Sequence, residues 1–457
     1  MSADEAVVIR GGHVLTMGPE GDLVDGAVGI VGNEIVAVDA YEAVCAALPD
    51  AAVVGDEHGI VLPGFVNAHT HLSEALIPGM GERFALPEWI ERIIVPVGRV
   101  LDAEAARVGT RLKAAEMLLS GVTTVNDMWA YSAVEHRATQ GVVDGLESMG
   151  LRGIACFGAT DLEGAVGLPA TQRAELLAEQ VELADRCRAS ELVDMRLGVG
   201  VVHGQSDELL ADSVALAEAE GWAVHTHLAE VREELTLSRI RWGATTTARA
   251  AAAGLLSRPT IAGHGVWLTD DDVDLLVSHG SAIVHNPAAN MILGSGICPV
   301  VRLRREGLPV AIGTDGAASN DAQNMFEVIK LTAMLQKLDA LDPAVFTARD
   351  ALTMATIEGA AALALDELVG SLEVGKRADV LRLDGHGIGL ASIHDPYQQI
   401  VYACGPPDVA DVWVDGRRRV ADGRLVDVHV RELVDESKEH ARRIVTDAGL
   451  AELSVLA

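Results

Sequence analysis

Eight short apolar runs recur along the middle of the chain, each separated from the next by a longer stretch rich in Ala, Leu and Glu. The runs cover residues 64–69, 123–127, 151–157, 196–203, 223–227, 260–264, 282–285 and 309–314. The clearest helix between them is predicted over residues 103–119, with Asp102 as its N-cap and Gly121 just past its end. Strand-like runs that alternate with helices are typical of a parallel sheet, and eight of them predict an α/β fold with a (β/α)8 TIM-like barrel.

The two ends of the chain carry a different, β-like pattern. Short strands are predicted over residues 6–17, 27–38 and 59–62, and Gly32-Asn33 is a hairpin-type turn inside the second of them. Comparable apolar runs return at residues 378–383 and 409–414. The most economical arrangement pairs the two ends in one small β-sandwich domain that the barrel interrupts.

These patterns divide the chain of 457 residues into four parts. We expect an N-terminal part of the β-sandwich at 1–62, a catalytic barrel at 63–367, a C-terminal part of the β-sandwich at 368–430, and a helical tail at 431–457. A barrel needs about 250 residues, so the length fits a barrel with one small companion.

Charge and cysteine usage exclude several classes of protein. The chain has 35 Lys and Arg against 67 Asp and Glu, a net charge of −32, which repels phosphate backbones and excludes nucleic acid as a partner. The five cysteines are dispersed with no C-x-x-C pair, which fits a reducing compartment. No signal-peptide pattern and no run of about 18 apolar residues is visible. We therefore expect a soluble, cytoplasmic protein that does not enter a membrane.

Histidines and one aspartate stand at the predicted C-terminal ends of the strands, where barrel enzymes carry their chemistry. His69 and His71 lie two residues apart, so an extended strand would place both imidazoles on one side. His227 ends the fifth run, and Asp315 follows the eighth. A buried cluster of this kind is costly unless a cation satisfies it, and imidazole favours zinc, iron or copper. The sequence predicts a metal site formed by these four residues.

Two further groups suit acid–base chemistry beside that metal. Glu230 stands three residues past His227 and can reach over the metal without binding it, which suits a proton shuttle. His264 ends the sixth run and can orient or deprotonate a metal-bound water, whose pKa a divalent ion lowers to about 7. Asp315 can hold the attacking water as well as the metal.

The distribution of lysine indicates how many ions are bound. No lysine occurs between Lys113 and Lys330, so none of the second to seventh strands can supply the carboxylated lysine that commonly bridges two metals in barrel hydrolases. A single divalent ion is therefore expected, with zinc as the first choice and iron(II) as the alternative.

Four segments together resemble the amidohydrolase superfamily: PGFVNAHTH at 63–71, HLAE at 227–230, AGHG at 262–265 and GTDGAASN at 313–320. The branch that they resemble includes the adenosylhomocysteine/methylthioadenosine deaminases and the triazine hydrolases. The segment GSLEVGKRADV at 370–380 is similar to that family's return to its β-domain. The resemblance covers almost the whole chain.

The resemblance implies that His69, His71, His227 and Asp315 bind one zinc or iron ion, with Glu230 and His264 as the acid–base pair. It implies hydrolytic deamination of an amino-substituted N-heterocycle of purine, pterin, pyrimidine or triazine type, with release of ammonia. It also implies a homodimer or larger homo-oligomer.

Three segments depart from the pattern of the nucleoside deaminases, and these differences bear on the substrate. Residues 96–98 (PVG) lack the acidic residue that binds ribose in the nucleoside deaminases, residues 76–79 (LIPG) lack an arginine, and residues 202–206 (VHGQS) form a shortened motif. Adenosine-type substrates are therefore less favoured than the resemblance alone implies. The candidates for the substrate pocket are His203, Glu74, Trp89 and Trp129.

Two other readings of the same residues stay open. The machinery could expel chloride or an alkylamine from an s-triazine, or open a cyclic amide. A catalytically inactive barrel is the other reading, although such relatives usually lose a ligand or the glutamate, and all six positions are filled in this chain.

Overall fold

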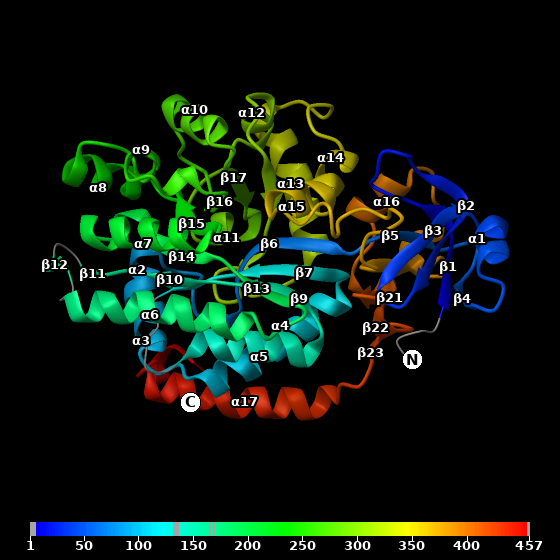
Figure 1. The fold of residues 1–457 in the computed structure, drawn as a ribbon, viewed down its shortest axis with the longest axis horizontal. Helices are drawn as coiled ribbons and strands as arrows, with labels where there is room; N and C mark the ends of the chain where they lie inside the picture. The colour runs from blue at the N-terminus through cyan, green and yellow to red at the C-terminus, as the bar shows by residue number, and fades with distance from the viewer. Residues whose placement is uncertain (1–5, 131–136, 164–165, 168–169, 455–457) are drawn as a thin grey trace.

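The computed structural model describes residues 6–130, 137–163, 166–167 and 170–454 of the chain. Figure 1 shows two parts: a mixed sheet made from both chain ends, and a larger body in which helices surround parallel strands. The α/β class and the parallel sheets predicted from the sequence are confirmed.

The parallel strands form two hydrogen-bonded sheets. The seven-stranded sheet contains β18 (Val310–Ile312), β17 (Ala282–His285), β16 (Thr260–His264), β15 (Val224–Leu228), β14 (Leu197–Val201), β10 (Phe157–Ala159) and β8 (Trp129–Ala130), in that order. The five-stranded sheet contains β13 (Val193–Met195), β9 (Arg152–Ala155), β7 (Val122–Asp127), β6 (Phe65–His71) and β19 (Asp315–Gly316). A small antiparallel ladder joins β11 (Leu162–Glu163) to β12 (Val166–Gly167).

The predicted run at 196–203 contains β14 and ends in a 3-10 turn at Val202–Gly204, whereas the runs at 151–157 and 309–314 are each broken in the structure. The run at 151–157 is divided at Cys156 into β9, which pairs with β7 and β13, and β10, which pairs with β8 and β14. The run at 309–314 is continued by Gly313-Thr314 into β19, which pairs with β6, whereas β18 pairs with β17. Each break occurs where the chain exchanges one neighbouring strand for another, so both sheets share the same stretches of chain.

Helices follow most of these strands and cover them. The larger ones are α4 (Ala103–Leu119), α5 (Ala138–Met149), α6 (Ala170–Cys187), α7 (Asp207–Glu220), α8 (Arg232–Trp242), α10 (Asp270–Ser278) and α13 (Met325–Ala340). The shorter ones are α2 (Leu86–Trp89), η2 (Ile90–Ile94), α3 (Val95–Gly98), α9 (Thr246–Ala252), α11 (Pro287–Ile292), α12 (Val300–Arg305), α14 (Ala348–Met354) and α15 (Ile357–Ala362). The helix predicted at 103–119 is confirmed as α4, and the Asp102 carboxylate accepts a hydrogen bond from Ala105 N at 2.8 Å. Every residue of β6, β7 and β15 is buried, as expected for parallel strands that are covered on both faces.

The chain ends share one nine-stranded sheet. It contains β1 (Ala6–Val14), β2 (Leu23–Val31), β3 (Glu34–Ala40), β4 (Ala52–Gly55), β5 (Ile60–Pro63), β20 (Val380–Leu383), β21 (Val409–Val414), β22 (Arg417–Ala421) and β23 (Arg424–Leu425). The antiparallel pairing of β5 with β20 joins the N-terminal and C-terminal strands. The predicted turn at Gly32-Asn33 connects β2 to β3. The helix α1 (Tyr41–Ala47) was not expected from the sequence.

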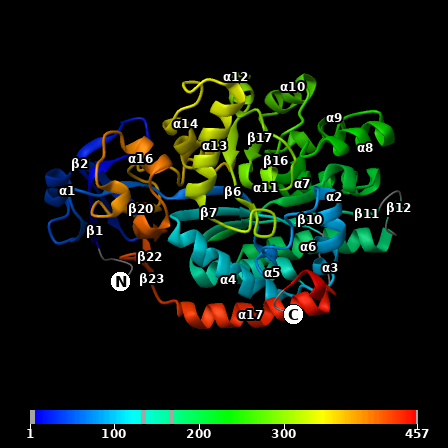
Figure 2. The same cartoon turned by 180° about the vertical axis from the view of Figure 1, so that it is seen from behind.

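Near the C-terminal end of the described residues, α17 (Val430–Asp447) packs against α4 in both views of the molecule (Figures 1 and 2). Arg443 pairs with Asp102, the N-cap of α4, at 2.9 Å. The helix α16 (Pro396–Tyr402) lies between β20 and β21 in sequence. Within the described ranges, no helix combines the length and the apolar character needed to cross a membrane.

Candidate metal and acid–base site

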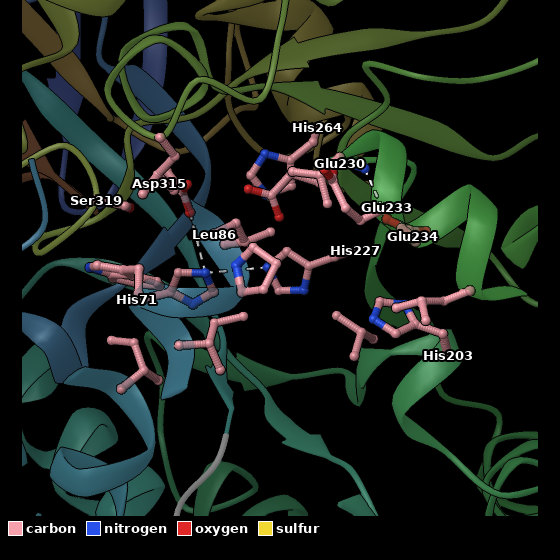
Figure 3. A pocket seen from close by; sticks show the side chains of 18 of the residues that line it. His71, Leu86, His203, His227, Glu230, Glu233, Glu234, His264, Asp315 and Ser319 are labelled. Atoms are coloured by element: carbon pink, nitrogen blue, oxygen red, sulfur yellow. Dashed lines mark hydrogen bonds and ion pairs between the residues drawn. The ribbon is translucent and has the colours of Figure 1, made fainter. Parts of the chain in front are cut away.

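Four side chains from distant parts of the chain meet at the C-terminal ends of the parallel strands. His69 and His71 come from β6, His227 from β15, and Asp315 from the first residue of β19. Asp315 Oδ1 lies 3.3 Å from His69 Nε2 and 3.2 Å from His71 Nε2, and His71 Nε2 lies 3.3 Å from His227 Nε2. Figure 3 shows Asp315, His71 and His227 pointing toward one another.

Hydrogen bonds between β6 and the segment after β18 explain why these motifs meet. Asn67 Nδ2 donates to Thr314 Oγ1 at 2.7 Å, and Thr314 N donates back to Asn67 Oδ1 at 3.0 Å. Thr70 Oγ1 donates to the backbone oxygen of Asp315 at 3.0 Å. Because side chains alternate along a strand, Asn67 lies on the same side of β6 as His69 and His71, and Thr70 lies on the other side. Bonds from both sides of β6 therefore hold the Asp315 segment next to the two histidines.

The histidine rings are turned so that their Nε2 atoms face the centre of the cluster. His71 Nδ1 donates to the backbone oxygen of Met128 at 2.6 Å, and His227 Nδ1 donates to that of Gly200 at 2.5 Å. A backbone carbonyl bound to one ring nitrogen fixes the tautomer and leaves the other nitrogen free to bind a metal. Glycine suits the position beside them, because a Cβ at Gly263 would lie 3.1 Å from His69 Nε2, a tight contact.

The donor set fits a divalent cation. His69 Nε2 and Asp315 Oδ1 are buried and make no hydrogen bond, and the ligand atoms of His69, His71 and His227 all lie within 4.8 Å of one another. Burial opposes ionisation of Asp315, but the neighbouring rings of His69 and His71 hold its pKa well below the usual value. Burial lowers the pKa of His69 to about 4, so this ring is neutral. Neutral imidazoles around a carboxylate are the ligands that zinc prefers.

The charge of the surroundings also favours a cation. Burial would lower the pKa of His71, yet the nearby carboxylates of Asp315 and Glu74 raise it to about 10. A proton on His71 thus partly replaces the positive charge that the cluster lacks. Burial raises the pKa of Glu74 to about 8.

Glu230 and His264 lie together beside this cluster (Figure 3). Glu230 Oε2 is 3.4 Å from His264 Nε2, and the other ring nitrogen of His264 donates to Asn290 Oδ1 at 2.9 Å. Burial raises the pKa of Glu230 to about 7, although the nearby His264 opposes the shift. A carboxyl group with a pKa near 7 can both accept and give a proton at neutral pH.

A pocket opens from the cluster. Three of the four residues expected in a substrate pocket line it, namely Glu74, Trp89 and His203. Its outer wall is aliphatic and contains Leu86, Pro87, Ile90, Ile94, Val201, Val231, Leu237 and Leu293. Within the part of the chain that the structure describes, no lysine or arginine lines this pocket.

Trp129, the fourth expected pocket residue, is placed apart from it. Its side chain is 1% exposed, belongs to the hydrophobic core and is absent from the pocket lining. Trp129 belongs to the short strand β8, whose register places it opposite Phe157 of β10.

Two polar contacts of the site were missed by sequence reasoning. His225 places Nε2 2.8 Å from His69 Nδ1, directly behind a predicted metal ligand. Its position two residues before His227 repeats the spacing of His69 and His71, and that repeat was the available signal. Asn290, which holds His264, lies on α11 and has no signal in its local sequence.

Comparison with known proteins agrees with the fold and the motifs. A 5-methylthioadenosine/S-adenosylhomocysteine deaminase of Nitratidesulfovibrio vulgaris is 34% identical over 426 residues, covering 93% of this chain and 94% of that protein. The structure of an adenosine deaminase from Xanthomonas campestris with bound zinc superimposes with a TM-score of 0.88 at 31% identity, covering 96% of this chain and 98% of that one. Atrazine chlorohydrolase from Arthrobacter aurescens, at 24% identity, shares the fold with a TM-score of 0.87, over 95% of this chain and 100% of its own.

The model of the amidohydrolase family matches residues 60–419, which confirms the resemblance seen in the four sequence motifs. With deaminases among its relatives at more than 30% identity, the protein is a hydrolase of carbon–nitrogen bonds and belongs to the amidohydrolase family.

Proposed function

We propose that the protein is a mononuclear metal-dependent aminohydrolase that removes an amino group from an N-heterocycle and releases ammonia. The observation that carries this proposal is the cluster of His69, His71 and His227, whose ligand atoms lie within 4.8 Å of one another. The unpartnered Oδ1 of Asp315 lies against His69 and His71, and Glu230 and His264 lie together at its side. The names of the relatives support the same reaction, because the 34% and 31% identical proteins are deaminases of adenine nucleosides.

His69, His71, His227 and Asp315 would hold the ion. Zinc is the first choice, since the set combines nitrogen and carboxylate donors and the Xanthomonas campestris relative binds zinc, and iron(II) is the alternative. When bound, the ion supplies Lewis-acid activation of water.

The chain's own groups would then direct the protons. His264, held by Asn290, orients the attacking water together with Asp315 and accepts its proton. Glu230 gives a proton to the ring nitrogen next to the carbon that is attacked, which relieves the negative charge that develops there. Glu230, now ionised, takes from His264 Nε2, 3.4 Å away, the proton that came from water and passes it to the departing amino group. The proton left on the hydroxyl of the ring carbon then returns to Glu230, so that ammonia leaves, the ring keeps a carbonyl oxygen and both residues are restored.

The pocket favours a neutral heterocycle with an apolar substituent. Its ionisable lining groups, apart from histidines, are all carboxylates, including Glu74, Glu230 and Glu233. A phosphate or carboxylate on the substrate would be repelled by these groups, whereas an alkyl or aryl group gains contact with the aliphatic wall. Glu74 and His203 are the polar side chains that could receive N–H groups of the ring, with Trp89 as an apolar face.

The catalytic unit that we propose spans residues 63–367, between β-domain parts at 1–62 and 368–430 and before the tail at 431–457. Pairing of β19 with β6 and of β18 with β17 supports a closed eight-stranded barrel, because both pairs are made by one continuous stretch of chain. The joining of β5 to β20 supports one β-domain built from both chain ends.

A panel of substrates tests the reaction. We expect release of ammonia from neutral aminated purines, pterins, pyrimidines or triazines, and no turnover when the same ring carries a phosphate. Ammonia is measured by a coupled assay and the products by mass spectrometry. Release of chloride or an alkylamine instead would identify the s-triazine hydrolase reaction, and a ring-opened acid would identify a cyclic amide hydrolase. No product from any member of the panel by the metal-loaded protein would contradict the proposal.

Replacement of His225 by Leu is expected to weaken zinc binding by about 10- to 100-fold, the usual effect of removing a partner of a ligating histidine. In the unsubstituted protein, His69 Nδ1 lies 2.8 Å from His225 Nε2. The substitution leaves this buried ring nitrogen without a hydrogen-bond acceptor. The measurement is competition with a chelator of known zinc affinity. His225→Gln is the matched control, because its amide oxygen can accept the same bond; equal affinity of the Leu variant and the unsubstituted protein would refute the role.

A further inference from the structure

The Glu234 carboxylate accepts hydrogen bonds from two successive backbone N–H groups in the active site. Its Oε1 accepts hydrogen bonds from Ala229 N at 2.8 Å and from Thr246 Oγ1 at 2.5 Å, and its Oε2 accepts one from Glu230 N at 3.0 Å. Glu234 stands in the first turn of α8 and is 4% exposed. Figure 3 shows it directly beside Glu230 at the wall of the pocket.

The backbone at this point needs such support. Ala229 has φ of 52°, a left-handed conformation that costs an L-residue other than glycine about 1 to 2 kcal/mol. Ala229 and Glu230 are also buried, so their N–H groups have no access to bulk water. A carboxylate that accepts from both groups stabilises the turn after β15, which is the turn that carries Glu230.

The three bonds also restrict what else Glu234 can do. A carboxylate has about four acceptor sites, and in Glu234 three of them already accept a hydrogen bond. The group is therefore committed to the protein backbone and to Thr246. Glu230, by contrast, directs its own Oε2 to His264 Nε2 at 3.4 Å.

We propose that Glu234 is a positioning residue for the proton transfer. By fixing the peptide between Ala229 and Glu230, it aims the Glu230 carboxyl at the place where the substrate ring must lie. This inference rests on the proposed function, in which Glu230 is the proton shuttle. Glu234 lines the pocket, but its hydrogen bonds go to Ala229, Glu230 and Thr246, so it acts through Glu230.

The substitution Glu234→Gln isolates this role, because glutamine has nearly the same shape but only one acceptor oxygen. Its NH2 group would face a backbone N–H, so one of the two bonds to Ala229 and Glu230 is lost. We expect kcat to fall by about 10- to 100-fold, the scale of a misplacement of about 1 Å. KM and the zinc content should stay unchanged. Thr246→Val, which removes only the hydroxyl bond, should have a smaller effect in the same direction.

A matched control is available in Glu179 of α6. It is 3% exposed, accepts a hydrogen bond from Thr139 Oγ1 at 2.7 Å, and is absent from the pocket lining. Glu179→Gln therefore removes a buried carboxylate of the same kind away from the site, and kcat should stay unchanged.

The decisive measurement is the double variant Glu230→Gln/Glu234→Gln. If Glu234 acts through Glu230, the second substitution lowers kcat no further once the shuttle is gone. A further drop equal to that of Glu234→Gln alone would overturn the positioning role, as would an unchanged kcat in Glu234→Gln itself. Should Glu234→Gln fail to fold, Thr246→Val is compared in the unsubstituted protein and in the Glu230→Gln variant. It should lower kcat in the first and not in the second. Full activity of Glu230→Gln alone would instead refute the proposed function.

Discussion

Glu230→Gln is expected to lower kcat by about 100- to 10,000-fold, the usual contribution of a positioned general acid–base group. This loss corresponds to about 3 to 5 kcal/mol of transition-state stabilisation. The amide keeps the shape of the side chain and can still donate a hydrogen bond, but it cannot transfer a proton to the ring or to the departing amine. Because Glu230 is placed beside the cluster rather than in it, zinc content and KM should change little.

Steady-state kinetics with the best substrate of the panel, together with metal analysis, check this result. Glu179→Gln serves as the control for loss of a buried carboxylate. A variant that keeps more than about one tenth of the original kcat would exclude Glu230 as the shuttle, since such a loss is below the range for general acid–base catalysis. A loss of bound zinc in the variant would mean that Glu230 is a metal ligand.

Much of the fold could be predicted because its signals are local. The runs at 260–264, 282–285 and 409–414 coincide with β16, β17 and β21, and the helix at 103–119 coincides with α4. Buried parallel strands appear in a sequence as continuous apolar runs, and helix ends are marked by caps such as Asp102. These features depend on a few neighbouring residues, so one sequence is enough to find them.

The breaks within strands could not be predicted, because they depend on partners far away in the sequence. The run at 151–157 has the pattern of one continuous strand, yet Cys156 divides it where its neighbours change from β7 and β13 to β8 and β14. Nothing in the run itself indicates which strands will lie on either side. The same reason applies to Trp129, whose position near a strand end suggested the pocket although its ring packs in the core.

The site shows the same division between local and distant information. Spacing and position in the chain were sufficient to single out the six residues that the structure brings together, since strand ends of parallel sheets meet on one side. The contacts behind them were not visible. Glu234 of α8 reaches the turn after β15, and His225 of β15 reaches His69 of β6, through contacts between segments that no local pattern connects. The sequence indicates the reacting groups more readily than the residues that hold them in place.

Removal of the metal is expected to abolish turnover, and restoration with zinc or iron(II) should return it in proportion to the metal bound. In the proposed mechanism the cation is what makes water a strong nucleophile at neutral pH. The residual activity of stripped samples should therefore follow their residual metal content, as measured by elemental analysis. Activity that persists after complete removal would end the metal-dependent mechanism.

The substitution Asp315→Asn tests the same metal dependence by removing one proposed ligand. Asp315 has φ of 63°, and asparagine tolerates this left-handed conformation, so the substitution removes the charge without adding backbone strain. Loss of the anionic ligand leaves the imidazoles of His69, His71 and His227 with a doubly charged ion and no protein carboxylate to balance it. We expect the variant to bind zinc more weakly and to show no turnover even in excess zinc, because the carboxylate that orients the water is also lost.

In the unsubstituted protein, zinc at about 1,000 times its Kd should add about 4 kcal/mol to the free energy of unfolding, and this gain should be smaller in the Asp315→Asn variant. Thermal unfolding with and without zinc measures the difference, and an equal gain in both proteins would show that Asp315 is not a ligand.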